Sequence, residues 1–249
     1  PHPRPMPRRP PPATLKGGGR PYTGTQRPRL SKGLHFDEAQ PKTAAAARQI
    51  RVLAANPAPA RPAAWQSPAI GAVEIKGAAS FERGVFTLKG TLDIWGTNDG
   101  YHFVWQRFTG DGQITARVLS VENTFNHAKA GLMFRESLAV DAKHAAACVT
   151  PVDGTQFLAR TETGGKTTSE KTAQDKGKLP YWVRLVRAGD KFSGYESPDG
   201  QTWRQIGSTN IVMGREICVG LVTSSHQKSI LCTATLDQVE IKPGPARKD

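Results

Sequence analysis

Six histidines are the first side chains to consider for catalysis or metal binding, because imidazole can act as a base and as a metal ligand near neutral pH. No two of them have a ligand spacing such as H-x-x-x-H. The sequence also has no G-x-S-x-G elbow, and Gly17–Gly19 lacks the following Lys-Ser/Thr of a phosphate loop. We therefore expect no catalytic residue, no metal and no cofactor. The six are interpreted as surface or second-layer residues: His2, His35, His102, His127, His144 and His226.

Tryptophan and arginine offer a different chemistry, the binding of sugars. Sugar rings stack on Trp faces, and their hydroxyl groups need polar side chains nearby. Trp105 and Arg107 share one strand face, and so do Trp182 and Arg184, while Arg160 lies on a neighbouring run. Such a groove of two Trp and three Arg would bind an acidic or a neutral glycan. The alternative is that both tryptophans belong to a core.

Arg135 has two interpretations. On a strand, Leu132, Phe134 and Glu136 point to one side, and Met133 and Arg135 point to the other. In a concave sheet, Arg135 could donate to a sugar hydroxyl or to an acidic group. Alternatively, Arg135 and Glu136 anchor adjacent strands or loops through charge-assisted hydrogen bonds, which is the interpretation we favour.

Three cysteines allow at most one disulfide within the chain, and none of them forms a C-x-x-C motif. Cys218 and Cys232 lie on two runs predicted to be neighbouring strands, so a bridge between them is conceivable. Cys148 and these two each sit in an apolar strand pattern. The pattern therefore favours three buried thiols.

The positive charge is concentrated in residues 1–64, which carry twelve Lys and Arg against two acids and thirteen of the 19 prolines. Such a segment cannot bury enough apolar surface to offset its ordering entropy, so it is predicted to be an extended arm with one short helix at 42–55. The residues expected to bind a partner are Arg4, Arg8, Arg9, Arg20, Tyr22, Arg27, Arg29 and Phe36.

Three kinds of partner suit this arm. Phosphate contacts would serve nucleic acid, but few base-stacking aromatics are available there, so nucleic acid is not the expected partner. Anionic lipid headgroups attract basic residues at about 1 kcal/mol each. Docking on other protein subunits gains a large contact area from few residues, and this is the expected use.

From about residue 65 the sequence consists of short runs rich in β-branched and aromatic residues, separated by turns that contain Gly, Asp and Asn. We predict an all-β fold, a two-sheet antiparallel sandwich over 65–242, followed by a tail at 243–249. No apolar run reaches the eighteen or so residues of a membrane helix. Strands are expected near 73–76, 84–89, 102–109, 112–121, 129–135, 143–150, 155–161, 181–188, 190–197, 202–208, 216–224 and 230–241.

An ordered set of motifs lies within residues 65–241: Asp93–Trp105, Gly110–Gly112, Lys129–Ser137, Lys143–His144, Val149–Pro151, Tyr181–Leu185 and Ser197–Trp203. On these motifs the sequence resembles bacterial modules of the concanavalin A-like lectin/glucanase superfamily, of the regulation-of-enolase or laminin-G-like type. The resemblance implies a jelly roll of two curved sheets, usually in exported accessory domains, of which some bind carbohydrate.

Some members of this superfamily are glycoside hydrolases, which carry a Glu-x-Asp-x-x-Glu triplet because acid and nucleophile must flank one glycosidic bond about 5 Å apart. This sequence has no such triplet. Its nearest acids are too far apart along the chain to share one strand face: Glu74 with Glu82, Asp93 with Asp99, and Glu162 with Glu170. The sequence therefore does not predict an enzyme.

Together these features predict a non-catalytic accessory or structural subunit, tethered by its basic arm to a larger complex. We expect that complex to be extracytoplasmic, periplasmic or secreted, and membrane-associated. The alternative is a lectin-like carbohydrate-binding module that uses the Trp and Arg residues of the concave sheet.

Overall fold

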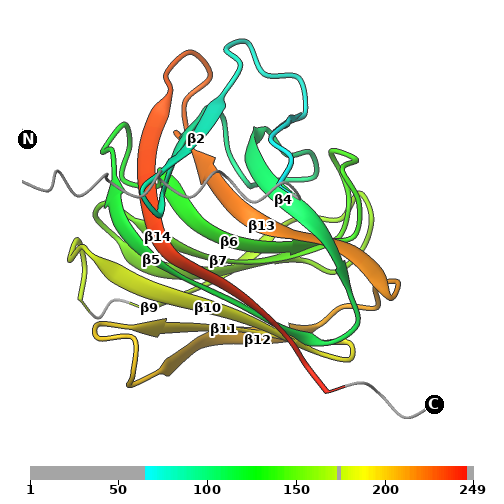
Figure 1. Ribbon diagram of the computed structural model, residues 1–249. Helices are drawn as coiled ribbons and strands as arrows, with labels where there is room; N and C mark the ends of the chain where they lie inside the picture. The colour runs from blue at the N-terminus through cyan, green and yellow to red at the C-terminus, as the bar shows by residue number, and fades with distance from the viewer. Residues whose placement is uncertain (1–64, 173–174, 246–249) are drawn as a thin grey trace, which may run out of the picture. The chain divides into compact units, whose positions relative to one another are not determined.

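The computed structural model describes residues 65–172 and 175–245, which fold as an antiparallel β-sandwich (Figure 1). Every strand in these residues belongs to one of two sheets of seven strands, so the predicted all-β fold is confirmed. Within the same residues, no helix is long and apolar enough to cross a membrane. The expected arm, with its helix at 42–55, lies outside the described residues.

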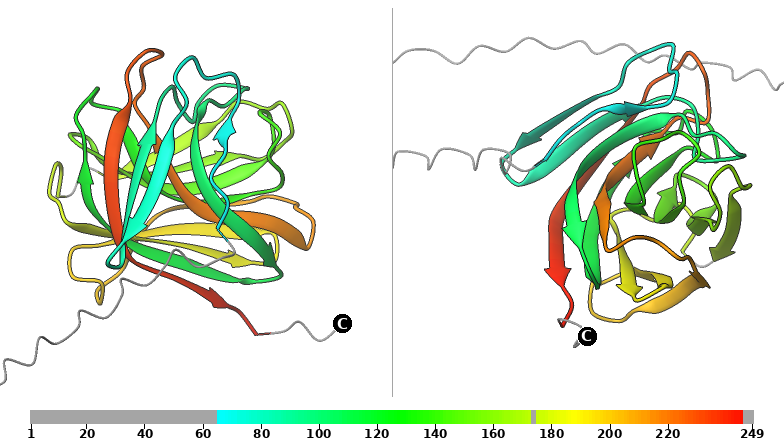
Figure 2. Two further views of the ribbon diagram at one scale, coloured as in Figure 1. Left: turned by 45° about the horizontal axis from the view of Figure 1, so that its top comes forward. Right: turned by 90° about the vertical axis from the view of Figure 1, so that its right-hand side faces the viewer.

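The two sheets lie face to face (Figure 2). The first sheet contains, in spatial order, β1 (Ala69–Ile70), β4 (Tyr101–Thr109), β13 (Glu216–Ser224), β6 (Lys129–Arg135), β7 (His144–Thr150), β8 (Gly154–Arg160) and β9 (Thr168–Thr172). The second sheet contains β12 (Arg204–Asn210), β11 (Lys191–Ser197), β10 (Tyr181–Ala188), β5 (Gly112–Val121), β14 (Cys232–Pro243), β3 (Val85–Gly90) and β2 (Ala78–Glu82).

Alternating apolar residues assign the faces of the second sheet. On β10, Val183 and Leu185 are fully buried, whereas Trp182 and Arg184 on the opposite face are partly exposed. This period of two is what a strand with one covered face requires. The inward residues of both sheets form one core, as the alternation in the sequence predicts.

The sequence missed three strands, β1, β2 and β9. Strands β2 and β9 are sheet edges with partly exposed residues, and edge strands often lack the apolar alternation that marks a central strand. The strand expected at 73–76 is wrong, because these residues form a loop after Gly71. Gly71 has φ +77°, and a Cβ there would lie 2.2 Å from the Asp99 carbonyl oxygen.

The start of β12 is shifted from the expected residue 202 to Arg204. The Asp199 carboxylate accepts hydrogen bonds from the backbone N–H groups of Gln201 and Thr202 at 2.8 and 2.7 Å. These bonds hold the preceding segment in a turn. They also lower the pKa of Asp199 to about 2.

All three cysteines are free and buried. The expectation that Cys218 and Cys232 lie on neighbouring strands is wrong, because β13 belongs to the first sheet and β14 to the second. Burial raises the pKa of Cys148 to about 12. Cys148 therefore remains a protonated thiol at neutral pH.

The centre of the first sheet is covered on both faces. Its strands β6, β7 and β8 consist entirely of buried residues. One face packs against the second sheet, and the other, which we call the outer face, carries a separate apolar cluster. That cluster contains Tyr101, Phe103, Met133 and Leu158. Loops must therefore close over the outer face.

Asp99 holds these loops together. Its buried carboxylate accepts a hydrogen bond from Arg135 Nη1 at 2.5 Å and a bidentate pair from Arg160 Nη1 and Nη2 at 2.9 and 2.8 Å. All three side chains have no solvent exposure. Because Asp99 lies in the segment between β3 and β4, these bonds fix the 91–100 loop on the outer face of the first sheet.

Arg160 also binds carbonyl groups of two other loops. Its guanidinium donates to Val140 and Ala142 in the β6–β7 loop and to Gly165 in the β8–β9 loop. A further bond reaches the Gly96 carbonyl oxygen at 3.2 Å. One guanidinium thus joins three loops, as expected of its planar set of five N–H donors.

We expect Asp99→Ala to lower the free energy of unfolding by about 3–5 kcal/mol, because it leaves two buried guanidinium groups without a counter-charge. Urea denaturation at pH 7 measures this change. The matched control is Glu162→Gln, which removes an exposed carboxylate and should change stability by no more than about 0.5 kcal/mol. An equal, small effect of both variants would contradict the anchoring role of Asp99.

Candidate functional site

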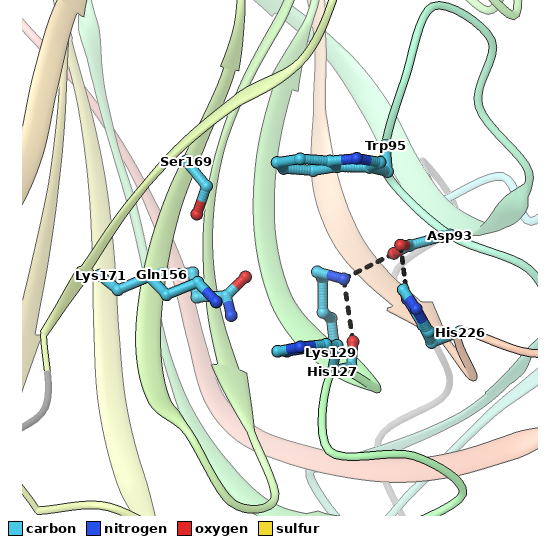
Figure 3. A pocket seen from close by; sticks show the side chains of 8 residues that line it. All are labelled: Asp93, Trp95, His127, Lys129, Gln156, Ser169, Lys171 and His226. Carbon is cyan, nitrogen blue, oxygen red and sulfur yellow. Dashed lines mark hydrogen bonds and ion pairs between the residues drawn. The ribbon is translucent and has the colours of Figure 1, made fainter. Parts of the chain in front are cut away.

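A hollow on the outer face of the first sheet is the candidate functional site (Figure 3). Its volume is about 250 Å³, which suits a single ring-sized group rather than a long ligand. Residues from strands and loops line it: Asp93, Trp95, His127, Lys129, Gln156, Ser169, Lys171 and His226.

Strand register brings the floor of the hollow together. Gln156 on β8 is the cross-strand partner of Lys171 on β9, and Leu158 is the partner of Ser169. Residues two apart on a strand share a face, so Gln156, Ser169 and Lys171 all point to the outer face. Lys129 enters from β6, on the other side of β7.

Loops supply the opposite wall. Asp93 and Trp95 come from the 91–100 loop, and His226 comes from the β13–β14 loop. The two loops are joined by backbone hydrogen bonds, from Leu92 N–H to the Gln227 carbonyl at 2.8 Å and from His226 N–H to the Leu92 carbonyl at 2.7 Å. These bonds make one continuous wall of the two loops.

Asp93 organises the charges of this wall. Lys129 Nζ donates to Asp93 Oδ1 at 2.6 Å and to the His127 carbonyl oxygen at 2.9 Å. His226 Nδ1 donates to Asp93 Oδ2 at 2.6 Å. Both carboxylate oxygens therefore have partners, and the positive charge of the buried Lys129 is compensated.

One exposed aromatic ring borders the hollow, and a second packs on His226. Trp95 is 50% exposed, and its ring lies across one side of the hollow in Figure 3. Phe125 is 41% exposed and stacks on His226 with ring centroids 4.5 Å apart. An exposed Trp is costly to leave in water, and it offers a flat apolar face to a ligand.

Two polar groups in the hollow have no partner. Gln156 is only 2% exposed, yet its amide nitrogen Nε2 makes no hydrogen bond, and the buried hydroxyl of Ser169 also makes none. An unpaired buried donor costs about 1–3 kcal/mol. A ligand that accepts from these groups would recover that cost.

The imidazole of His127 lies at the lower edge of the hollow, where Nδ1 is 2.9 Å from Asp153 Oδ2. Burial and the nearby ammonium of Lys171 lower the pKa of His127, and Asp153 opposes this shift. These surroundings favour the neutral imidazole of His127. The interpretation of His127 and His226 as surface or second-layer residues must be extended, because both line the hollow.

The predicted groove of Trp and Arg residues does not form, and that prediction is wrong. Arg135 and Arg160 are sealed around Asp99, which confirms the anchoring role we favoured for Arg135. Trp105 is in the first sheet and 6% exposed, whereas Trp182 and Arg184 belong to the second sheet. The outward faces of the two sheets lie on opposite sides of the sandwich, so these residues do not share a groove.

The remaining residues of that groove make local contacts. Arg107 is highly exposed and lies 3.8 Å from Glu216, and Trp105 packs in the apolar cluster of the outer face. On the second sheet, the Arg184 guanidinium stacks on Trp203 at 3.8 Å. The predicted partner-binding residues Arg4 to Phe36 lie outside the described residues.

The sequence analysis predicted a binding role for none of the residues that line the hollow. One signal was available: Trp95 stands in a segment of Gly, Asn and Asp residues, where a buried strand cannot continue. A large aromatic residue in such a loop is more often exposed than one in a strand. Within the described residues, no group of three His, Cys, Asp or Glu side chains is arranged to hold a metal ion.

Comparisons with known proteins define the fold. No family model and no curated protein matches the sequence. A functionally unknown protein from Saccharomyces cerevisiae is similar in structure, with a TM-score of 0.59 and 17% identity over 73% of this chain and 98% of that one.

Two other solved structures share the sandwich at lower similarity. A Bacillus licheniformis β-glucanase has a TM-score of 0.50 and 10% identity over 76% of this chain and 99% of that one. A mutant GH43 protein, also from Bacillus licheniformis, has a TM-score of 0.50 and 14% identity over 67% of this chain and 38% of that one. These similarities show an antiparallel β-sandwich fold and nothing about activity.

We expect His102 and His144 to remain neutral down to pH 5. Burial lowers the pKa of His102 to about 4 and that of His144 to about 3, below the value near 6.5 in the unfolded chain. At pH values between the folded and the unfolded pKa, the unfolded chain binds more protons than the folded one. The free energy of unfolding should therefore fall as the pH falls from 6.5.

NMR titration of the imidazole protons tests the first point, and urea denaturation between pH 6.5 and 5 tests the second. This range lies above the ordinary pKa of carboxylates, so histidines dominate the change. A resonance of either residue that titrates near pH 6.5 would contradict the assignment.

Proposed function

We propose that the described sandwich is a carbohydrate-binding module, with its ligand in the hollow under Trp95. The observation that carries the proposal is the pairing of a half-exposed Trp95 ring with the unpartnered, buried amide of Gln156 in the same small hollow. This combination suits a ligand that has an apolar face and hydrogen-bonding edges, which describes a sugar ring.

The dimensions and the polarity of the hollow support a sugar over other small ligands. At about 250 Å³ the hollow accommodates one ring, and the open side leaves room for a chain to continue. Its lining contains Lys, Gln, Ser, Asp and His side chains beside the Trp95 ring. A purely apolar ligand would leave these groups unsatisfied.

The lining favours binding over hydrolysis. Hydrolases that cleave glycosidic bonds commonly use two carboxyl groups, about 5 Å apart in retaining enzymes and farther apart in inverting ones. Asp93 is the single carboxylate among the lining residues, and Lys129 and His226 already occupy its oxygens. The expectation of a non-enzymatic chain accordingly stays a prediction.

We further propose that the module acts as an accessory subunit tethered through residues 1–64. The support is the charge distribution, with twelve Lys and Arg and two acids in this segment of a chain whose total charge is +13. Protein subunits on the extracytoplasmic side, with an anionic membrane surface nearby, remain the proposed partners.

Trp95→Ala should weaken glycan binding about tenfold or more, because it removes the stacking face. Calorimetry with the best ligand from a broad glycan panel measures the effect. Trp203→Ala is the matched control, since Trp203 lies against Arg184 on the second sheet and should leave binding unchanged. Unchanged binding by Trp95→Ala, or no glycan bound by the intact chain, would contradict the proposal.

Deletion of residues 1–64 should release the module from its assembly without loss of the sandwich. Co-purification from the native source compares the full chain with the deletion variant, and circular dichroism verifies the β fold of both. Replacement of the twelve Lys and Arg by Gln in the full-length chain is the second variant. Equal recovery of partners by all three proteins would argue against a tether.

A further inference from the structure

The two lysines that line the hollow differ in whether an acidic side chain compensates their charge. Lys129 is neutralised by Asp93 at 2.6 Å, but Lys171 has no acidic partner among the described residues. His127 and His226 add two groups that become positive on protonation, and each already faces a carboxylate, Asp153 and Asp93 respectively. The ammonium of Lys171 is therefore the uncompensated charge of this site.

Three donors gather on one side of the hollow. Gln156 and Lys171 are cross-strand neighbours, and Ser169 lies two residues before Lys171 on the same face of β9. In Figure 3 these side chains lie across the hollow from Asp93 and His226. These donors face the wall that contains Asp93, whose carboxylate already accepts hydrogen bonds from Lys129 and His226.

Donors outnumber acceptors in this cluster. The ammonium of Lys171 and the amide nitrogen Nε2 of Gln156 can only donate, whereas the Ser169 hydroxyl can donate or accept, and none of these three groups has a hydrogen-bond partner among the described residues. A neutral sugar hydroxyl brings a hydrogen that must also find an acceptor. A carboxylate or sulfate brings acceptors only, and its bonds to an ammonium group are charge-assisted.

We propose that this hollow selects an acidic sugar, with a carboxylate or sulfate group on Gln156, Ser169 and Lys171 and the sugar ring on Trp95. The inference rests on the proposed carbohydrate-binding function and specifies its ligand class. Asp93 holds Lys129 and His226 in place and keeps the opposite wall neutral, so the anionic group is directed to the β8–β9 side.

Calorimetry with three matched probes tests the proposal: glucuronate, glucose 6-sulfate and glucose, each at low and at physiological salt. At least one anionic probe should bind tenfold or more tightly than glucose, and added salt should reduce that preference. The two anionic probes separate carboxylate from sulfate as the preferred group.

Lys171→Met should remove the preference for the anionic probe while retaining weak binding of the ring. Lys191→Met is the matched control, because it removes an equal charge from an exposed lysine on β11 of the second sheet and should leave the preference intact. Gln156→Leu, a variant of similar size, should also weaken binding of the anionic probe.

Equal affinity for glucose and both anionic probes, or an unchanged preference in Lys171→Met, would overturn the acidic-sugar inference and leave the carbohydrate site standing. Absence of binding by all three probes and by the wider glycan panel would overturn the carbohydrate site itself. Thermal unfolding of each variant distinguishes a lost contact from a lost fold.

Discussion

The ion pairs of Asp99 with Arg135 and Arg160 are the constraint on which the site depends. One buried carboxylate faces two guanidinium groups, and the excess positive charge is spread over carbonyl oxygens of three loops. Burial of such charges has a large desolvation cost, so the ion pairs add little net stability. Their contribution is to specify one arrangement of the loops, the one in which every charged group has its partners. That arrangement sets the position of Trp95.

The outer face of the first sheet is divided by these loops into a sealed part and an open part. Around Asp99 the loops close over Arg135, Arg160 and the neutral imidazole of His144. Towards β9 they leave the hollow. The hollow lies partly over β6 and β8, whose residues are all buried, and partly over the edge strand β9, whose residues are partly exposed.

The sequence was sufficient for the fold class and for most strands of the two sheets, but it was insufficient for the site, for a physical reason. Alternation along β10 depends on that strand alone, and it is sufficient to place Val183 and Leu185 in the core. The hollow combines side chains from β6, β8, β9 and three loops, and only the spatial order of the strands brings them together. Arg160 was misassigned for the same reason: its partner Asp99 is 61 residues away in the chain.

The loop that carries Trp95 is closed at both ends. A backbone hydrogen bond of 3.0 Å joins Gly100 N–H to the Asp93 carbonyl, and the carboxylates of Asp93 and Asp99 are bound to different parts of the first sheet. Between these anchors, Thr97 and Asn98 are exposed. Thr97 and Asn98 thus form a variable tip: their side chains can change beside the hollow while the buried Ile94 and the Gly96 carbonyl keep the loop attached to the sheet.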